Sequence, residues 1–210
     1  SIHDTLDVEI NNSLFSSNEI YDDTIHIVYA KNISLKNTKI LKAYRDAIDI
    51  DLSKNILIEN IEINFSNNDG LDFMESEAEV INVEIKNSKD KGISVGENSK
   101  IVIRNSKLSD NAIGIAVKDK SYAKVHETQL SNNLTQIAAY AKNWKYGGGG
   151  QVDIYNSIFK AKINKFSTFV DPEDINKKIN KALNQDSKIN IFESKVNGQR
   201  EIVGKNFFIN

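Results

Sequence analysis

The stretch IVIRNSKLSDNAIGIAVK, residues 101–118, contains three short runs in which apolar residues alternate with polar ones. The apolar positions are Ile101 and Ile103, then Leu108, then the run from Ile113 to Val117. Alternation with a period of two is typical of β-strands that bury one face. The stretch therefore predicts three short strands separated by turns.

The same pattern recurs along the chain at a nearly constant spacing. A segment of the form apolar-x-apolar-x-Asn repeats, and its polar pivots are Asn12, Asn37, Asn60, Asn82, Asn105, Glu127, Asn156 and Glu193. Most successive pivots are separated by a similar interval, and only the last two intervals are clearly longer. A second column, which keeps the same period, consists of Ile25, Ile48, Leu71, Ile93, Ile115 and Ile137. Two columns that share one period indicate a solenoid of stacked coils.

The residue types decide which solenoid this is. A leucine-rich repeat needs Leu at several fixed positions and often a helix, whereas these repeats use mainly Ile and Val in three strands. We therefore predict an all-β fold, a right-handed parallel β-helix with about 22 to 23 residues per coil and about eight coils, as a single domain over residues 1–210. Coils stacked about 4.8 Å apart place like residues in ladders along the axis.

The Asn column predicts a ladder of side-chain amides at a buried turn. Such amides can bond upward and downward along the axis and so satisfy the turn. Glu127 and Glu193 would interrupt an amide ladder, so we expect both near its edge.

The two long intervals exceed the length of one coil. The first contains Gly147–Gly150, and four glycines disfavour a regular strand, which predicts a protruding loop over residues 141–151. The second contains Asp171 as a helix N-cap, Pro172 at the first helical position, and apolar residues at every fourth position. This pattern predicts one short helix near the C-terminus, inserted at residues 171–185.

The composition excludes several functional classes. The chain has 27 basic and 29 acidic residues and a net charge of −2, so it offers no broad positive field for nucleic acid. No apolar run reaches about 18 residues, so we expect no membrane-spanning helix. The absence of Cys excludes disulfides, zinc knuckles and thiol nucleophiles. We expect His3, His26 and His126 on different coils or faces, which disfavours a His-based zinc site.

The repeat predicts an acidic face. One outward column reads His26, Asp49, Asp72, Ser94 and Ala116, and the next reads Val28, Asp51, Met74, Gly96 and Lys118. Two more carboxylates, Asp46 and Asp69, occupy the turn just before this strand in consecutive coils. Five carboxylates are therefore expected to lie together, with nearby Lys residues as compensation.

Carboxylates bordered by Lys and aromatic residues match the chemistry of a carbohydrate site. For substrate binding we predict Asp46, Asp51, Asp69, Lys91, Glu97, Asp119, Tyr140, Trp144 and Tyr146. As catalytic candidates we predict Lys118, Asp49 and Asp72. Asp49, Asp51 and Asp72 are also the predicted ligands of a Ca²⁺ ion, which is the cofactor we expect if there is one.

Several phrases resemble those of a known group of proteins. The phrases DGLD at residues 69–72 and DKGISVGE at residues 90–97, with the segment Tyr140–Gly149, resemble parallel β-helix domains of bacterial exported proteins. That group is the NosD-like, carbohydrate-binding and sugar-hydrolase type, including domains linked to CotH-like modules. The resemblance implies the β-helix fold, a secreted, periplasmic or cell-surface location, and neighbouring domains in a larger chain.

Three functions remain open on the sequence. The leading one is recognition or remodelling of a cell-envelope or extracellular polysaccharide through the acidic face. The first alternative is a polysaccharide lyase or epimerase in which Lys118 is the base and Ca²⁺ neutralises a uronate. A glycoside hydrolase is disfavoured, because the GHG and RIK phrases of polygalacturonase-type enzymes do not occur. The second alternative is a structural spacer or adhesin module.

Overall fold

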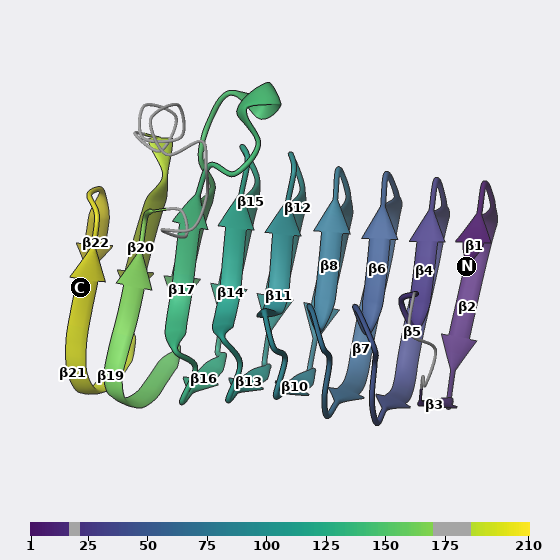
Figure 1. Cartoon of the computed structure of the whole chain (residues 1–210), viewed down its shortest axis with the longest axis horizontal. Coiled ribbons are helices and arrows are strands. Elements are labelled where there is room, and N and C mark those ends of the chain that lie inside the picture. Colours follow the sequence, from purple (N-terminus) through teal and green to yellow (C-terminus); the bar gives the residue numbers. More distant parts are fainter. Residues whose placement is uncertain (17–21, 170–185) are drawn as a thin grey trace.

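The chain forms a parallel β-helix in a computed structural model that describes residues 1–16, 22–169 and 186–210. Its coils are stacked side by side along the long axis, and the two ends of the chain lie at opposite ends of the stack (Figure 1). Each coil adds one parallel strand to each of three stacks of strands, which together enclose the core.

The first stack carries the predicted acidic face. Its strands are β1 (Ile2–His3), β4 (Ile25–Val28), β6 (Ile48–Asp51), β8 (Leu71–Met74), β11 (Lys91–Gly96), β14 (Ile113–Lys118) and β17 (Thr135–Tyr140). The stack continues with the end of β19 (Ile158–Ser167), whose residues Phe166 and Ser167 pair with β17.

The second stack forms the next side of the solenoid. It contains β2 (Leu6–Asn11), the first part of β5 (Lys31–Ile40) and of β7 (Lys54–Ile63), then β9 (Glu77–Ile81), β12 (Lys100–Arg104), β15 (Tyr122–His126), β18 (Gln151–Tyr155), β20 (Lys188–Phe192) and β22 (Phe207–Ile209).

The third stack closes the coil. It contains β3 (Leu14–Phe15), the ends of β5 and β7, then β10 (Glu84–Lys86), β13 (Lys107–Ser109), β16 (Gln129–Ser131) and the first parts of β19 (Ile158–Ser167) and β21 (Lys195–Val203). In the coils of β5 and β7 one long strand bends from the second stack into the third, where three short strands were expected.

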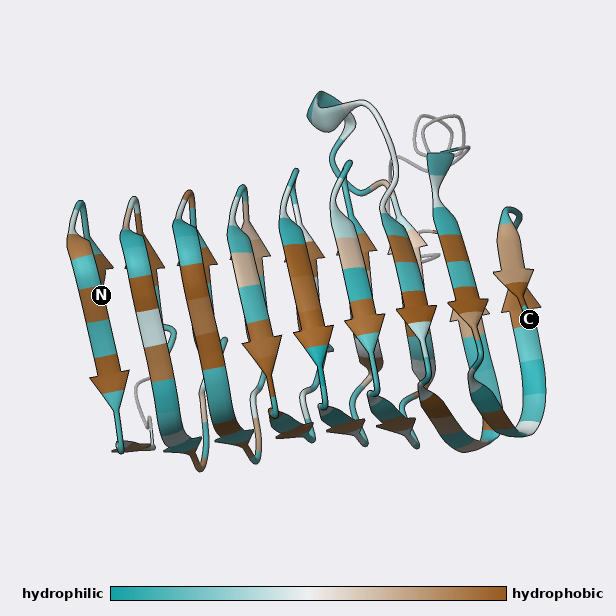
Figure 2. Cartoon of the chain, turned by 180° about the vertical axis from the view of Figure 1, so that it is seen from behind, coloured by the Kyte–Doolittle hydropathy of each residue, from teal (hydrophilic) through white to brown (hydrophobic). Residues whose placement is uncertain are grey.

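The predicted register is confirmed. Ile25, Ile48, Leu71, Ile93, Ile115 and Ile137 are successive pairing partners, and all are buried. Apolar and polar bands alternate along the strands (Figure 2). Burial of these β-branched and aliphatic side chains against the coils above and below supplies the main stabilising term of the fold.

The Asn column forms the expected ladder of side-chain amides over part of its length: Asn60 Nδ2 donates to Asn37 Oδ1 at 3.1 Å, and Asn82 Nδ2 donates to Asn60 Oδ1 at 2.6 Å. The turn is exposed, and every pivot has a positive φ, for example 48° at Asn37 and 55° at Asn60. Asn adopts this left-handed conformation more readily than most residues. Glu127 and Glu193 adopt it as well, with φ of 49° in both, so neither breaks the column. Both lie outside the three pivots that these amide bonds join.

Hydroxyl ladders satisfy the buried turns, in addition to the amide ladder at the exposed one. At one corner a hydroxyl in each coil accepts a hydrogen bond from a backbone N–H in the preceding coil, for example from Ser53 N to Ser76 Oγ at 3.1 Å. The members of this ladder are Ser53, Ser76, Ser99 and Ser121. A second ladder of the same kind joins Ser106, Thr128, Ser157 and Ser194.

The Gly-rich segment forms a loop between β17 and β18. It contains the short 3₁₀ helix η1 (Trp144–Tyr146), which ends at Gly147 with φ of 70°. Gly150 then passes so close to β14 that a Cβ there would lie 2.0 Å from the carbonyl oxygen of Val117. The predicted helix at residues 171–185 lies outside the described residues. Within the described ranges, no helix has the length and apolar character needed to cross a membrane.

Candidate functional site

The acidic face lies on the outer side of β4, β6 and β8, and we define it by His26, Asp49, Asp51 and Asp72. His26 pairs with Asp49, and Asp49 pairs with Asp72, in consecutive coils. The side chains of His26, Asp49 and Asp51 remain 22, 17 and 20% exposed. The ladder therefore brings together the carboxylates that the repeat predicted, at positions that solvent can reach.

The carboxylates of the acidic face repel one another. Burial raises the pKa of Asp49 to about 8, and the charges of Asp51, Asp72, Asp23 and Asp46 add to the effect. Burial and the charge of Asp72 also raise the pKa of Asp51, although His26 opposes this shift. Such shifts mean that the folded protein does not supply enough positive charge to this cluster.

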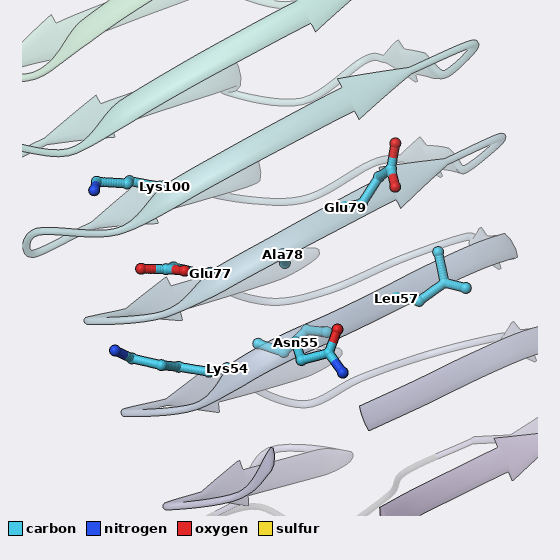
Figure 3. A pocket seen from close by; sticks show the side chains of 8 residues that line it. Lys54, Asn55, Leu57, Glu77, Ala78, Glu79 and Lys100 are labelled. Atoms are coloured by element: carbon cyan, nitrogen blue, oxygen red, sulfur yellow. The ribbon is translucent and has the colours of Figure 1, made fainter. Parts of the chain in front are cut away.

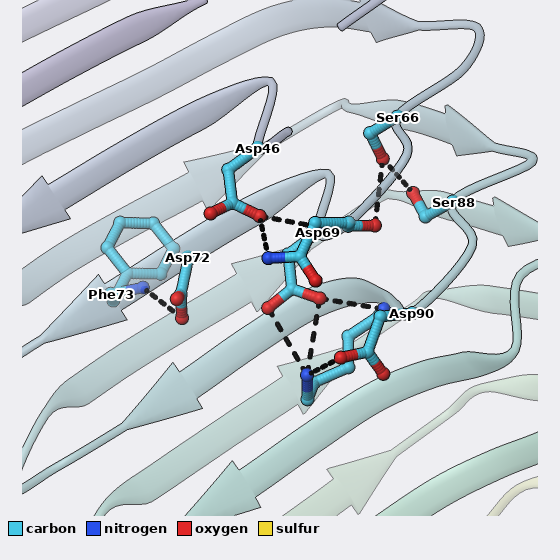
Figure 4. Close-up of polar contacts among 9 residues, drawn as sticks. Asp46, Ser66, Asp69, Asp72, Phe73, Ser88 and Asp90 are labelled. Atoms are coloured by element: carbon cyan, nitrogen blue, oxygen red, sulfur yellow. Dashed lines mark hydrogen bonds and ion pairs between the residues drawn. The ribbon is translucent and has the colours of Figure 1, made fainter. Parts of the chain in front are cut away.

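A carboxylate ladder lies beside the acidic face, in the turn before each strand. Asp46 N donates to Asp23 Oδ1 at 3.0 Å, Asp69 N donates to Asp46 Oδ1 at 2.6 Å, and Lys91 N donates to Asp69 Oδ1 at 2.8 Å. The Lys91 ammonium turns back onto this ladder, contacting Asp90 and lying 3.3 Å from Asp69 Oδ1 (Figure 4). As in the hydroxyl ladders, a side-chain oxygen accepts a hydrogen bond from the backbone of the adjacent coil, but here the donor lies in the following coil and not in the preceding one.

Three of the predicted substrate contacts are therefore structural. Asp46, Asp69 and Lys91 are all buried. Burial raises the pKa of Asp46 to about 7 and that of Asp69 to about 6, and Lys91 partly offsets the shift at Asp69. Burial opposes the charge of Lys91, but Asp69 outweighs it, so the pKa of Lys91 lies above its ordinary value. These groups hold the turn, and direct contact with a substrate is not supported for them.

Lys118 lies on the outer side of β14 and is only 4% exposed. Its side chain extends over Gly96, where a Cβ would lie 2.9 Å from Lys118 Cε. Burial opposes its charge, but the carboxylates of Asp72 and Glu97 outweigh that effect, so the pKa of Lys118 is raised. Glu97 is half-buried, and burial raises its pKa although Lys118 opposes the shift. Lys118 therefore stays protonated, which argues against the predicted role of general base.

The Gly-rich loop is fixed at two points. Asp119 Oδ1 accepts hydrogen bonds from Lys142 N at 2.7 Å and from Asn143 N at 2.8 Å. At the other point the Tyr146 hydroxyl donates to Glu75 Oε1 at 3.0 Å, and Glu75 directly follows β8. The loop therefore reaches from the coil of β17 back to the coil of β8, and it presents Trp144 with 61% exposure.

Two predicted binding residues receive other roles from this arrangement. Asp119 is fully buried and positions the loop, so the prediction that it contacts a substrate is not supported. Tyr140 is buried against Ala116 and Ala138 on the outer side of β14 and β17. Burial raises the pKa of Tyr140, and Lys118 partly opposes this shift. Of the three aromatic residues predicted to bind a substrate, Trp144 is the most exposed.

The predicted metal set is revised. Among the described residues, three ligand atoms come within 4.8 Å of one another in the groups His26–Asp49–Asp51, Asp23–Asp46–Asp49 and Asp22–Asp23–His26, and Asp72 belongs to none of them. Asp72 Oδ1 instead accepts a hydrogen bond from Phe73 N at 3.0 Å (Figure 4).

The three histidines lie in different coils, as expected, but two of them share a face. His3 and His26 lie on one face, and their ring centroids are 5.6 Å apart. His3 pairs with Val28, so it belongs to the second outward column. The sequence held a signal for this proximity of His3 and His26. The interval from Asn12 to Asn37, the first of the repeat, equals the interval from His3 to Val28, so His3 was expected to stack on Val28.

A shallow hollow lies elsewhere, on the second stack. It has a volume of about 580 Å³ and is lined by residues of β7, β9 and β12 (Figure 3). Lys54, Glu77 and Lys100 alternate in charge along it, as expected for a solvated face with cross-strand pairing. It contains none of the residues of the acidic face.

Comparison with known proteins places the fold among β-helices. A family model described as a right-handed β-helix region matches residues 23–165. No curated protein matches the chain. The predicted likeness to NosD-like and CotH-linked domains stays a prediction.

Two solved structures are similar in fold. An alginate lyase from Paenibacillus sp. str. FPU-7 is 8% identical with a TM-score of 0.54, and the alignment covers 89% of this chain and 76% of that one. Pectate lyase Pel9A is 12% identical with a TM-score of 0.52, and the alignment covers 91% of this chain and 59% of that one. The chain thus spans less than two thirds of the pectate lyase, and at these identities the likeness concerns the fold alone.

Proposed function

This chain belongs to the right-handed β-helix family, and from that premise we propose that it binds an acidic polysaccharide on the acidic face. The observation that carries the proposal is the crowding of Asp49 and Asp51 at positions that solvent can reach, with their pKa values raised by burial and by neighbouring carboxylates. Carboxylates crowded against one another at a solvent-accessible position are typical of a binding site.

A cation joins the acidic protein to an acidic polymer in this proposal. Ca²⁺ takes six to eight oxygen ligands. At the edge of the acidic face, the carboxylates of Asp23 and Asp46, which also accept the backbone hydrogen bonds of the turn, have ligand atoms within 4.8 Å of one another and of Asp49. Three protein carboxylates leave coordination positions for water and for uronate carboxylates of the polymer. The similar structures support this choice of polymer, because alginate and pectate are both polyuronates.

Trp144 completes the proposed site. An exposed indole can stack on the apolar side of a sugar ring, and the hydrogen bond from Tyr146 to Glu75 anchors the loop at the coil of β8. The polymer would then contact the cation at β4 and β6 and the indole above the ends of the strands. We propose a secreted, periplasmic or cell-surface setting for the protein, where it would meet such a polymer.

The test is calorimetric titration with alginate and polygalacturonate oligosaccharides, in millimolar Ca²⁺ and in EDTA. We expect Ca²⁺-dependent binding that Asp49→Asn and Trp144→Ala each weaken at least about tenfold. Asp110→Asn is the matched control, because Asp110 is an exposed carboxylate just after β13. Absence of binding to both polymers in Ca²⁺ would overturn the proposal and favour a structural spacer.

A lyase or epimerase is the second candidate, since Lys118 lies close to Asp72 and Glu97. Its burial and raised pKa favour binding over this chemistry. Incubation with the same polymers separates the two, because β-elimination produces unsaturated ends that absorb ultraviolet light. A rise in absorbance that Lys118→Ala abolishes would establish the lyase, and a flat trace with Ca²⁺-dependent binding supports recognition alone.

A further inference from the structure

We infer that His26, Asp49 and Asp51 form a binding site for a divalent transition-metal ion of the Zn²⁺ class. The three side chains come from the adjacent strands β4 and β6. His26 and Asp49 are direct pairing partners, and Asp51 lies two positions further along β6 on the same face. The site is therefore built on two hydrogen-bonded strands, which hold the ligands in place better than a loop would.

The distances suit an ion shared by three ligands. His26 Nε2 lies 3.7 Å from Asp49 Oδ2 and 3.8 Å from Asp51 Oδ2. Bonds of about 2.0–2.2 Å in a tetrahedral zinc site place neighbouring ligand atoms about 3.4 Å apart. The observed separations are too long for hydrogen bonds and need to close by only a few tenths of an ångström around an ion.

A second observation comes from the imidazole itself. His26 Nε2 is buried and has no hydrogen-bond partner among the residues that the structure describes. The other ring nitrogen, Nδ1, lies 3.4 Å from Ser1 Oγ, so Nε2 is the atom directed at the carboxylates. The imidazole as a whole is 22% exposed, but Nε2 is shielded from water, and the two carboxylates nearest to it lie beyond hydrogen-bond distance. An ion between Nε2 and the carboxylates supplies the partner that this nitrogen lacks.

The imidazole determines the class of ion. Ca²⁺ prefers oxygen ligands, whereas an imidazole nitrogen combined with carboxylates suits Zn²⁺. Asp49 also belongs to the all-carboxylate group proposed above for Ca²⁺, so the two ions compete for one side chain. Three protein ligands on a partly exposed face leave the fourth tetrahedral position open to water or to an oxygen of a bound molecule.

Calorimetric titration with Zn²⁺ alone tests this inference, after the protein has been treated with EDTA and returned to buffer. We expect one Zn²⁺ per chain, and His26→Gln should weaken its binding at least tenfold. His126→Gln is the matched control and should bind as wild type does. His126 Nε2 is also buried and without a partner among the described residues, but it lies on β15 of the second stack.

A measurement on the wild-type protein keeps the test independent of folding defects in the variants. Zn²⁺ coordination should shift the ¹⁵N resonance of His26 Nε2 and leave the His126 nitrogens unchanged. Equal Zn²⁺ affinity of wild type and His26→Gln, or an unshifted His26 resonance, would overturn the inference. Polysaccharide binding in Ca²⁺ is expected to persist in His26→Gln, so failure of the zinc site and failure of the proposed function are distinguishable.

Discussion

The outer side of the first stack is divided into two halves that share one backbone. In the half formed by β4, β6 and β8, the ladder places His26 on Asp49 and Asp49 on Asp72, and these side chains remain accessible. In the half formed by β11, β14 and β17, it places Ser94 on Ala116 and Ala116 on Ala138, and all three are buried.

The difference shows what a ladder does to side chains of each type. Stacking puts like on like, so small residues pack closely and favourably, whereas carboxylates repel at the same spacing. The covered half behaves as additional core, with Tyr140 packed on Ala116 and Ala138. The acidic half carries an electrostatic cost that the fold does not require, which is why we propose the function there.

The largest effect is expected when a carboxylate of the acidic half is copied onto the covered half. Ala116→Asp puts a carboxylate at the position that corresponds to Asp72, but at a fully buried site. We expect a loss of about 4 kcal/mol in the free energy of unfolding, because an unpaired buried charge is strongly destabilising. Chemical denaturation measures it, with Ala116→Ser as the control. A loss below about 1 kcal/mol would show that the covered half can open.

The reverse experiment removes charge from the acidic half. Asp49 has an ordinary pKa of 3.8 and a folded pKa of about 8, so the fold favours its protonated form. The stability that this preference provides is present below pH 3.8 and is lost as the pH rises to about 8. Asp49→Asn should therefore add about 2 kcal/mol of stability at pH 8 in EDTA and little at pH 4.

Urea denaturation at the two pH values checks this prediction, with Asp110→Asn as the exposed control. Saturating Ca²⁺ should reduce the gain, since a bound ion stabilises the wild-type cluster that Asp49→Asn disrupts. If Asp49→Asn lowers stability at pH 8 in EDTA, the carboxylates are not repelling one another, and the distinction between the halves fails.

Gly96 lies at the boundary of the two halves and gives a smaller effect. An alanine Cβ there would lie 2.9 Å from Lys118 Cε and 3.2 Å from the carbonyl oxygen of Phe73. We expect Gly96→Ala to cost about 1.5 kcal/mol, because the Lys118 side chain must move from its place over β11. Measured in a Lys118→Ala background, the cost should shrink, and an unchanged cost would assign the strain to Phe73 instead.

The period of the repeat made the fold and the neighbours on the acidic face predictable. A constant coil length puts Asp49 beside Asp72 whatever the rest of the chain does, because strands in a stack pair residue by residue. The local structure changed two predictions that were made from columns of the repeat. The Asn pivots do form an amide ladder, but at an exposed, left-handed turn and not at a buried one. Asp46 and Asp69 accept backbone hydrogen bonds in a turn.

Burial at the other end of the face was not predictable from a period. Lys118 and Asp119 follow the same repeat as exposed positions, yet both are buried. The loop that binds Asp119 is anchored by a hydrogen bond between Tyr146 and Glu75, which lie several coils apart in the chain. A repeat of one coil's length does not encode that contact, so the path of the loop over this end of the face could not be predicted from the period.

Removing that contact should give the smallest effect and the most local one. Tyr146→Phe deletes the hydroxyl that donates to Glu75, a bond that, after burial, helps raise the pKa of Tyr146 to about 12. The cost in the free energy of unfolding should be about 0.5–1 kcal/mol, because the bond is exposed.

Trp144 is the only tryptophan, so acrylamide quenching of its fluorescence reports on the loop. Quenching should increase in Tyr146→Phe, whereas the control Tyr29→Phe should change nothing. Unchanged quenching in Tyr146→Phe would mean that Asp119 and the backbone hydrogen bonds of Gly149 and Gly150 hold the loop without the contact to Glu75. The loop would then be fixed by its own and the neighbouring coil, and the contact with the coil of β8 would have no part in dividing the two halves.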